Sequence, residues 1–327
     1  MRSISKRPQS ISRSHLTVIF AYLATAIILH SAPAGDLSTG RHESAKVLRW
    51  KFERGQKLNV LRVRSSKSVT TSSAPVTIER STKSSDNYVF LIEGVDKNGA
   101  ARVALSMGRT TMSMTGPDGK INFDSAAEDP KEGPIDEMSK GMREILQAMR
   151  IHFTMSPRGN ILEPKFDEES INLIQSSPGA AGLKRFTSPQ AITDMLKNLF
   201  PPFPESAVNV NDTWKDSLLM RRSQGDQTME RVFTYKGTTI VDGNQVEQID
   251  NEGKIDFGGF IKAASKGGIK TVITSQDNHG TQFFDSQSGI PISIEVSENV
   301  QIDGTASGGS LRQVESTTTK ITVSRLK

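Results

Sequence analysis

Apolar residues occupy alternate positions over two long parts of the chain, residues 48–123 and 213–323. The run at 101–107 places Ala, Val, Leu and Met at every second position, and the run at 290–296 does the same with Ile and Val. A period of two predicts β-strands that bury one face. Turn sequences such as Asp242-Gly243 separate the runs, and they favour antiparallel hairpins.

The period lengthens to that of an α-helix in the middle of the chain. Apolar residues at 135–149 form one helical stripe, and a weaker stripe covers 166–175. A third stripe follows Ser188-Pro189, a helix cap with proline in the first turn, and ends before Pro201. We therefore predict a strand-rich α+β fold, in which mostly antiparallel, curved sheets carry two to three short helices inserted at about 134–200.

The stretch at 65–85 is rich in Ser, Thr and Lys and has two interpretations. It resembles a linker in composition, but Val69, Val76 and Ile78 interrupt the polar residues. An edge strand protected by lysines and by Pro75 fits the sequence equally well.

The first residues have the character of an export signal. Four basic residues and no acidic one precede an apolar run at 16–29, and Ala32-Pro33-Ala34 offers small residues at a cleavage site. The alternative, an uncleaved membrane anchor, would need about 20 apolar residues. We predict a signal peptide at 1–34, a polar leader at 35–44 and a single β-rich domain at 45–327. The mature protein would be periplasmic or secreted, with no membrane span after cleavage.

Composition excludes several classes of function. The chain has no cysteine, so it has no disulfide, no lipid-modified cysteine, no thiolate nucleophile and no cysteine metal site. Four of its 41 basic residues and none of its 36 acidic residues lie before Gly35, which leaves 37 against 36 in the mature chain. A balance so close to neutral gives no electrostatic footprint for nucleic acid, so we expect no nucleic-acid partner.

No recognisable catalytic or metal motif is present. His152 and His279 are not spaced as a metal-binding pair, and no Gly-x-Ser-x-Gly sequence places a nucleophilic serine. The segment 250–256 lacks the donor spacing of a calcium loop and indicates a polar turn. Gly258-Gly259 and Gly267-Gly268 indicate flexible loops. We assign no catalytic residue, no metal site and no cofactor. A triad assembled only by the fold remains an alternative.

Methionine is unevenly distributed, because seven of the eleven residues fall between 107 and 155. A methionine-rich seam can line a pocket for varied apolar ligands, and the alternative is irregular core packing between a helix and a sheet. We expect the helix at 135–149 to lie against strands that carry the preceding methionines. The candidate ligand-binding residues are Met107, Met112, Met114, Met138, Met142 and Met149.

Three short motifs resemble those of an uncharacterised family of exported bacterial β-rich proteins. They are the segment 48–58 with its Trp-Lys-Phe strand and following glycine, the turn at 156–161, and the turn at 210–214. Asn211 stands where that family has glycine, and asparagine tolerates the left-handed conformation, so the turn should be kept. The motifs are structural. The resemblance therefore implies export and a β-rich fold, but no activity and no site residues.

More loosely, a curved antiparallel sheet around short helices is similar to periplasmic lipoprotein and lipid carriers, whose concave face binds acyl chains. The first hypothesis is a non-enzymatic envelope protein that binds an apolar ligand or lipid between sheet and helices. One alternative is an interaction module that presents strand edges to another envelope protein. The other is a hydrolase with an unrecognised site.

Overall fold

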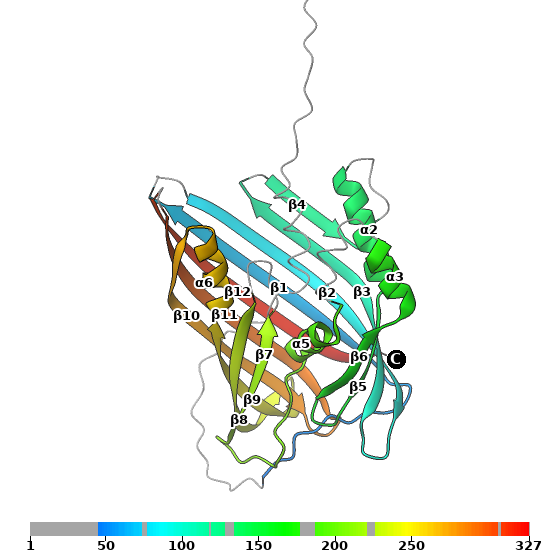
Figure 1. Cartoon of the computed structure of the whole chain (residues 1–327). Coiled ribbons are helices and arrows are strands. Elements are labelled where there is room, and N and C mark those ends of the chain that lie inside the picture. Colours follow the sequence, from blue (N-terminus) through cyan, green and yellow to red (C-terminus); the bar gives the residue numbers. More distant parts are fainter. Residues whose placement is uncertain are drawn as a thin grey trace, which may run out of the picture.

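The computed structural model in Figure 1 is dominated by one large antiparallel sheet. The structure describes residues 45–73, 77–117, 119–127, 134–176, 187–220, 226–306 and 309–326, with only the backbone at 134–138. The predicted signal peptide at 1–34 and leader at 35–44 lie outside these ranges. No helix within the described ranges has both the length and the apolar composition needed to cross a membrane.

The sheet has twelve strands. They are β1 (Lys57–Ser72), β2 (Thr77–Val95), β3 (Ala101–Gly116), β4 (Gly119–Asp124), β5 (Arg150–Met155), β6 (Ile161–Phe166), β7 (Thr213–Met220), β8 (Gln227–Val241), β9 (Asn244–Asp256), β10 (Lys270–Asp285), β11 (Ile290–Ala306) and β12 (Gly309–Leu326). The helices in the described ranges are α2 (Pro134–Ala148), α3 (Glu168–Ser176), α5 (Pro189–Leu199) and α6 (Gly258–Lys266). The predicted strand-rich α+β fold is confirmed.

The first and last strands meet at the centre of the sheet. The strand order is β6-β5-β3-β2-β1-β12-β11-β10-β9-β8-β7, and β4 pairs with the later part of β3. β1 pairs with β12 along its whole length, from Lys57 opposite Leu326 to Ser72 opposite Leu311. The first half of the chain therefore forms one side of the sheet, and the second half forms the other. We call the end at Lys57 the proximal end and the end at Ser72 the distal end.

The stretch at 65–85 is neither a linker nor an edge strand. It belongs to β1 and β2, which lie in the middle of the strand order, and residues 74–76 between them lie outside the described ranges. Within this stretch Ser66 and Thr82 are buried, so a polar composition does not place it at an edge.

Helix α5 lies between the two edge strands of the sheet. It contacts β6 at one edge and β7 at the other, and Figure 1 shows it in front of the sheet. Because the two ends of the strand order contact the same helix, the sheet curves around α5 and has a concave face. The helix begins as predicted: the Ala191 amide donates to Ser188 Oγ at 3.2 Å, and Pro189 occupies the first turn.

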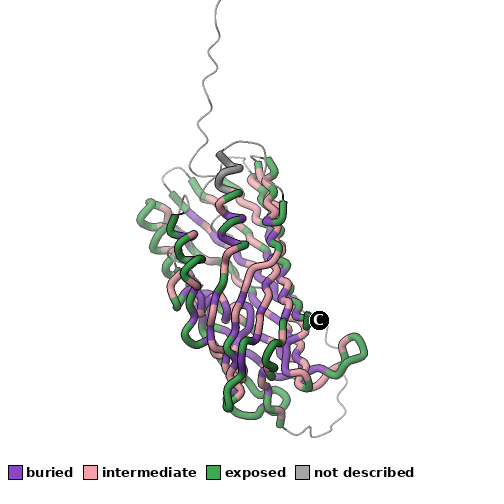
Figure 2. Tube along the Cα trace, turned by 90° about the vertical axis from the view of Figure 1, so that its right-hand side faces the viewer, coloured by how far each residue is buried: buried purple, intermediate pink, exposed green. Residues whose placement is uncertain are grey.

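The main hydrophobic core fills the proximal part of the concave face. It combines buried side chains from both sides of the sheet with α5 and the segment 200–208. Figure 2 shows buried positions gathered in the middle of the molecule, with exposed positions at its two ends. Both halves of the chain contribute to this core. The single domain at 45–327 stays a prediction.

The segment 45–53, which we call the strap, is extended but is not a strand. It crosses the proximal end and makes isolated backbone hydrogen bonds, from Trp50 N to Pro157 O at 2.8 Å and from Lys51 N to Gly289 O at 3.1 Å. The prediction of a β-strand at 48–52 is therefore wrong, because this segment does not pair with a neighbouring strand in the regular way. The alternation still buries Leu48 and Trp50, because extended backbone turns successive side chains to opposite faces.

Two other local interpretations are corrected. The segment 250–256 is not a polar turn but part of strand β9, paired with β8 and β10. Residues 258–266 form helix α6 rather than a loop. Glycine disfavours helix, but Phe260 and Ile261 pack against an apolar cluster, and this tertiary contact outweighs the low propensity.

The turn before β7 has the conformation that the resemblance implied. Asn211 has a φ of +72°, in the left-handed region, and its amide donates to Tyr235 O at 2.7 Å. Trp214 Nε1 donates to Pro202 O at 3.0 Å. The motif therefore joins β7 to β8 and to the segment after α5, which is a structural role.

Candidate functional site

The concave face carries a band of buried polar side chains halfway along the strands, which we call the polar belt. On β1, the buried positions change from Leu58 and Val60 to Arg62, Arg64 and Ser66. Side chains two positions apart share one face of a strand, so this face changes from apolar to polar within β1. Buried polar residues continue the belt on the other long strands: Thr82, Asp86, Thr110, Arg231, Asn251, Asn278, Gln282, Glu298, Thr317 and Thr319.

Strand register shows that the belt is continuous over the central strands, from β10 to β2. Glu298 of β11 lies opposite Asn278 on one side and opposite Thr317 on the other. Ser66 of β1 then lies opposite both Thr317 and Thr82. Five neighbouring strands therefore place a buried polar side chain in the same row.

A buried ion pair anchors the belt on β1 and β2. Arg62 donates from Nη2 and Nε to Asp86 Oδ2 at 2.6 and 3.1 Å, and the two side chains are 6% and 3% exposed. Burial acts to lower the pKa of Arg62, but the charges and hydrogen bond of its neighbours outweigh it and raise that pKa. Burial raises the pKa of Tyr88, whose ring centroid lies 5.7 Å from the guanidinium carbon of Arg62. Arg62 therefore stays charged and Tyr88 stays neutral.

A second buried network ties the belt to α5. Arg231 Nη2 donates to Asp216 Oδ2 of β7 at 2.5 Å and to the Lys197 carbonyl of α5 at 3.4 Å. Burial lowers the pKa of Arg231, and the charge of Asp216 opposes this effect. The network holds α5 against the β7 edge of the sheet.

Some belt atoms have no hydrogen-bond partner within the described ranges. They are Thr110 Oγ1, Thr319 Oγ1 and Arg231 Nε, all buried. Most buried polar atoms in native proteins are hydrogen-bonded, and an unpaired one costs about 1–3 kcal/mol. These atoms therefore offer hydrogen-bonding capacity to a polar group that reaches the belt.

Apolar surfaces lie on the distal side of the belt. On the second half of the sheet, seven buried residues form a cluster that α6 covers through Phe260 and Ile261: Leu218, Met220, Met229, Ile255, Phe257, Val300 and Ile302. On the first half, α2 packs on β3 and α3. The central strands between them in the strand order carry the partly exposed Ser68, Thr70 and Glu315 on the face that bears the belt.

The candidate methionines border this region. Met107, Met112 and Met114 lie on a single strand, β3, and α2, which carries Met142, packs on it as expected. Met112 shares a buried face with Thr110, two positions away, and so adjoins the belt. The structure places the other candidates differently. Met107 and Met149 pack on the main core, Met149 follows α2, and the side chain of Met138 lies outside the described part. A ligand-binding role for the methionines stays a prediction.

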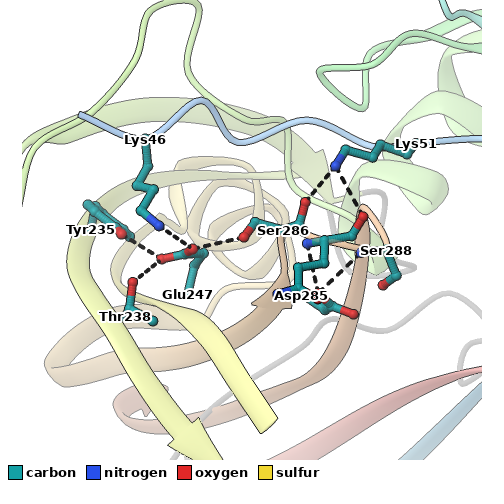
Figure 3. Close-up of polar contacts among 9 residues, drawn as sticks. Lys46, Lys51, Tyr235, Thr238, Glu247, Asp285, Ser286 and Ser288 are labelled. Atoms are coloured by element: carbon teal, nitrogen blue, oxygen red, sulfur yellow. Dashed lines mark hydrogen bonds and ion pairs between the residues drawn. The ribbon is translucent and has the colours of Figure 1, made fainter. Parts of the chain in front are cut away.

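A buried carboxylate holds the strap at the proximal end (Figure 3). The Glu247 side chain is 2% exposed, and its oxygens accept hydrogen bonds from three hydroxyl groups, those of Tyr235, Thr238 and Ser286, at 2.6, 2.9 and 2.9 Å. Lys46 Nζ of the strap lies 3.3 Å from Glu247 Oε1. These contacts join β8, β9, the β10–β11 turn and the strap, so Glu247 is a structural anchor.

The contacts of Glu247 predict how the stability of the protein depends on pH. Burial acts to raise the pKa of Glu247, but its hydrogen bonds and Lys46 lower it below the usual value of 4.5. A depressed folded-state pKa stabilises the protein above about pH 4.5, and this contribution is lost as the pH falls through the folded-state pKa. We expect Glu247→Gln to reduce the free energy of unfolding by about 1–3 kcal/mol at pH 7 and to weaken its dependence on acid pH. Urea unfolding at neutral and acid pH measures both effects. Equal acid dependence in the two proteins would contradict the assignment.

His152 and His279 are the two histidines in the described ranges. His152 Nδ1 lies 3.8 Å from Glu93 Oε2, and His279 Nδ1 lies 3.2 Å from the Asp277 carboxylate. Within the described residues, no group of three or more His, Cys, Asp or Glu side chains could hold a metal ion.

Three solved structures show a distant likeness to the chain. The chain is similar to lipovitellin, from a study of lipid–protein interactions in that protein, with a TM-score of 0.42 and 11% identity over 84% of this chain and 25% of that one. It is similar to a Bacteroides fragilis protein described as exported, with a YmcC-like fold (TM-score 0.23, 7% identity, 83% and 97% covered). It is also similar to Pseudomonas aeruginosa OccK7 (OpdD) (TM-score 0.23, 8% identity, 84% and 100% covered). Such low scores support no functional conclusion.

Comparison of sequences assigns the family. In the structure comparison above, the chain spans only a quarter of the lipovitellin chain. In the sequence comparison, no curated protein matches it significantly. A family model, in contrast, matches residues 98–291, from the β2–β3 turn into β11. Because this match covers more than half of the chain, the protein belongs to DUF6263, a family of unknown function.

Proposed function

We propose that the protein is exported and acts without catalysis, by binding an amphipathic lipid between the concave face of its sheet and the helices that cover it. The observation that supports this most is the polar belt, which lies inside the fold beside the apolar surface of α2 and β3. Export is supported by the basic lead, apolar run and small residues at 1–34.

Stability of the sheet alone does not explain the buried polar side chains of the belt. Burying a polar side chain costs free energy unless it is hydrogen-bonded, and a packed structural sheet is apolar on its inner face. The proximal core meets this expectation, and the belt does not. A polar headgroup that reaches Thr110 Oγ1 on β3, or one that reaches Thr319 Oγ1 on β12, would supply a missing partner.

The apolar part of the ligand has a suitable surface next to the belt. Met112 lies beside Thr110 on β3, and Met114 follows on the same face toward the distal end. Methionine side chains adapt to varied apolar shapes, as an acyl chain requires. The main core already fills the proximal part of the concave face, so the ligand belongs on the distal side of the belt.

Binding of a fluorescent fatty acid tests the proposal. Met114 is partly exposed, so a carboxylate there should leave the fold intact while opposing an apolar chain. We expect Met114→Glu to weaken binding at least about tenfold, because transfer of a charge into an apolar site is unfavourable. Met114→Leu, the matched control, should bind like the natural protein. Circular dichroism confirms that each variant is folded.

Native mass spectrometry of protein prepared without detergent provides the second measurement. Co-purified lipid supports the proposal. A stoichiometric protein partner without lipid would favour the interaction module instead. Failure of the natural protein to bind any apolar probe, or undiminished binding by Met114→Glu, would rule out the lipid site.

A further inference from the structure

Helix α6 presents an unbalanced positive charge at the distal end of the sheet. Residues 257–276 contain three lysines and no acidic residue. Lys262, Lys266 and Lys270 recur every four residues, and all three are exposed. None of them forms an ion pair with another residue of the described ranges, whereas other exposed cations such as Lys67 and Arg312 do. The mature chain as a whole is almost neutral, so this patch is a local feature.

The opposite side of α6 is apolar but shallowly buried. Phe260 and Ile261 pack on the distal apolar cluster, yet no residue of α6 is fully buried. Gly258-Gly259 begins the helix, and Gly267-Gly268 follows it. Because Phe260 and Ile261 attach α6 to the sheet, the exposed Lys262 and Lys266 are left on the side that a charged partner can reach.

We propose that α6 and the start of β10 form a surface that docks onto an anionic phospholipid membrane. The exposed lysines approach the lipid phosphates, while Phe260 and Ile261 hold α6 on the distal apolar cluster. Figure 1 shows α6 at the distal end, in front of the strands that carry the distal cluster. Docking would therefore bring the distal side of the belt to the membrane surface.

Charge and shape favour a membrane over an acidic protein. Lys262 and Lys266 lie one turn apart on α6, and Lys270 begins β10 just after it, which gives a compact group of positive charges that suits an anionic lipid surface. The patch contains no aromatic hot spot on its charged side, whereas stable protein interfaces usually centre on such a residue. The docking surface does not depend on lipid binding at the belt, so either proposal can fail without the other.

Vesicle sedimentation with the full mature chain tests the surface. We expect binding to vesicles of phosphatidylglycerol and phosphatidylcholine, and little binding to phosphatidylcholine alone. Each lysine near an anionic surface strengthens binding roughly fivefold, so Lys262→Gln with Lys266→Gln should weaken it roughly 25-fold. Lys57→Gln with Lys97→Gln makes the same charge change at the proximal end and should have little effect. Binding should also weaken as the salt concentration rises.

The absence of cysteine allows a second measurement. Ser265 is exposed on α6, so Ser265→Cys gives a single site for an environment-sensitive dye. The dye should shift to the blue on anionic vesicles, and the same dye on Lys97→Cys should not. Equal binding to both kinds of vesicle, or binding unchanged by the two α6 lysine substitutions, would overturn the proposal. A dye at Ser265 that responds only to an acidic protein would also overturn it.

Discussion

Replacing Asp86 with alanine should lower the free energy of unfolding by about 3–5 kcal/mol. The change leaves Arg62 buried on the concave face without its carboxylate, and no solvent replaces the hydrogen bonds at 2.6 and 3.1 Å. Breaking a buried pair is costly for this reason, although the intact pair itself contributes little net stability. Urea unfolding followed by circular dichroism measures the loss.

An exposed ion pair provides the matched control. Lys67 and Glu79 lie on the same two strands with side chains 59% and 61% exposed, and their atoms are 3.1 Å apart. Glu79→Ala should cost less than about 1 kcal/mol, because water solvates the remaining lysine. If Asp86→Ala costs no more than Glu79→Ala, the Arg62–Asp86 pair is not buried as described.

A double substitution separates stability from function in the belt. Arg62→Met with Asp86→Leu replaces the pair by apolar groups of similar size and should recover most of the lost stability. We expect the same variant to bind the fluorescent fatty acid more weakly, because the belt loses polar side chains beside the proposed headgroup site. A variant that is stable and binds normally would show that this pair is purely structural.

The alternation of residues was sufficient to predict strands but not their positions in the sheet. Residues 65–85 look like an edge strand or a linker because Ser, Thr and Lys dominate them. Their central position depends on pairing between β1 and β12, which lie at opposite ends of the chain. Local sequence contains no signal for that pairing.

The belt was missed for a related reason. Arg62, Arg64 and Ser66 alternate with Val63 and other residues, a pattern that normally indicates a solvent-facing polar side. The available signal was the spacing of Val60 and Arg62, which lie two positions apart. Both therefore lie on the face of β1 that is buried elsewhere in the strand. Only the curvature of the sheet around α5 shows that this side is the concave one.

The helices show where local signals succeed. Ser188-Pro189 predicted the start of α5, because capping depends on neighbouring residues alone. The glycine pairs around α6 predicted a loop, because the contacts of Phe260 and Ile261 that stabilise the helix come from distant strands. Similarly, the amphipathic stripe of α2 was enough to predict packing against a sheet and correctly placed it on β3.

Phe203→Ala should produce the other large loss of stability and also test whether the chain from the strap onward is one domain. Phe203 is 2% exposed, its ring centroid lies 4.6 Å from that of Phe284, and its amide donates to Arg158 O at 2.8 Å. Truncation of a buried phenylalanine costs about 3–5 kcal/mol, from lost transfer free energy and from the cavity that remains. Phe260→Ala, the same change in the shallower cluster under α6, should cost about 1–2 kcal/mol.

The two tryptophans make the domain test decisive. Trp50 lies in the strap, near the start of the described sequence, and Trp214 lies on β7, in the second half of the chain. Both contact the main core. Variants that retain one tryptophan report each region separately by fluorescence, and circular dichroism reports the sheet. Because residues from both halves form the same core, we expect all three signals to change in one transition that Phe203→Ala shifts as a unit. Two transitions, of which the substitution moves only one, would mean that the halves fold as separate domains and that the belt crosses a domain boundary.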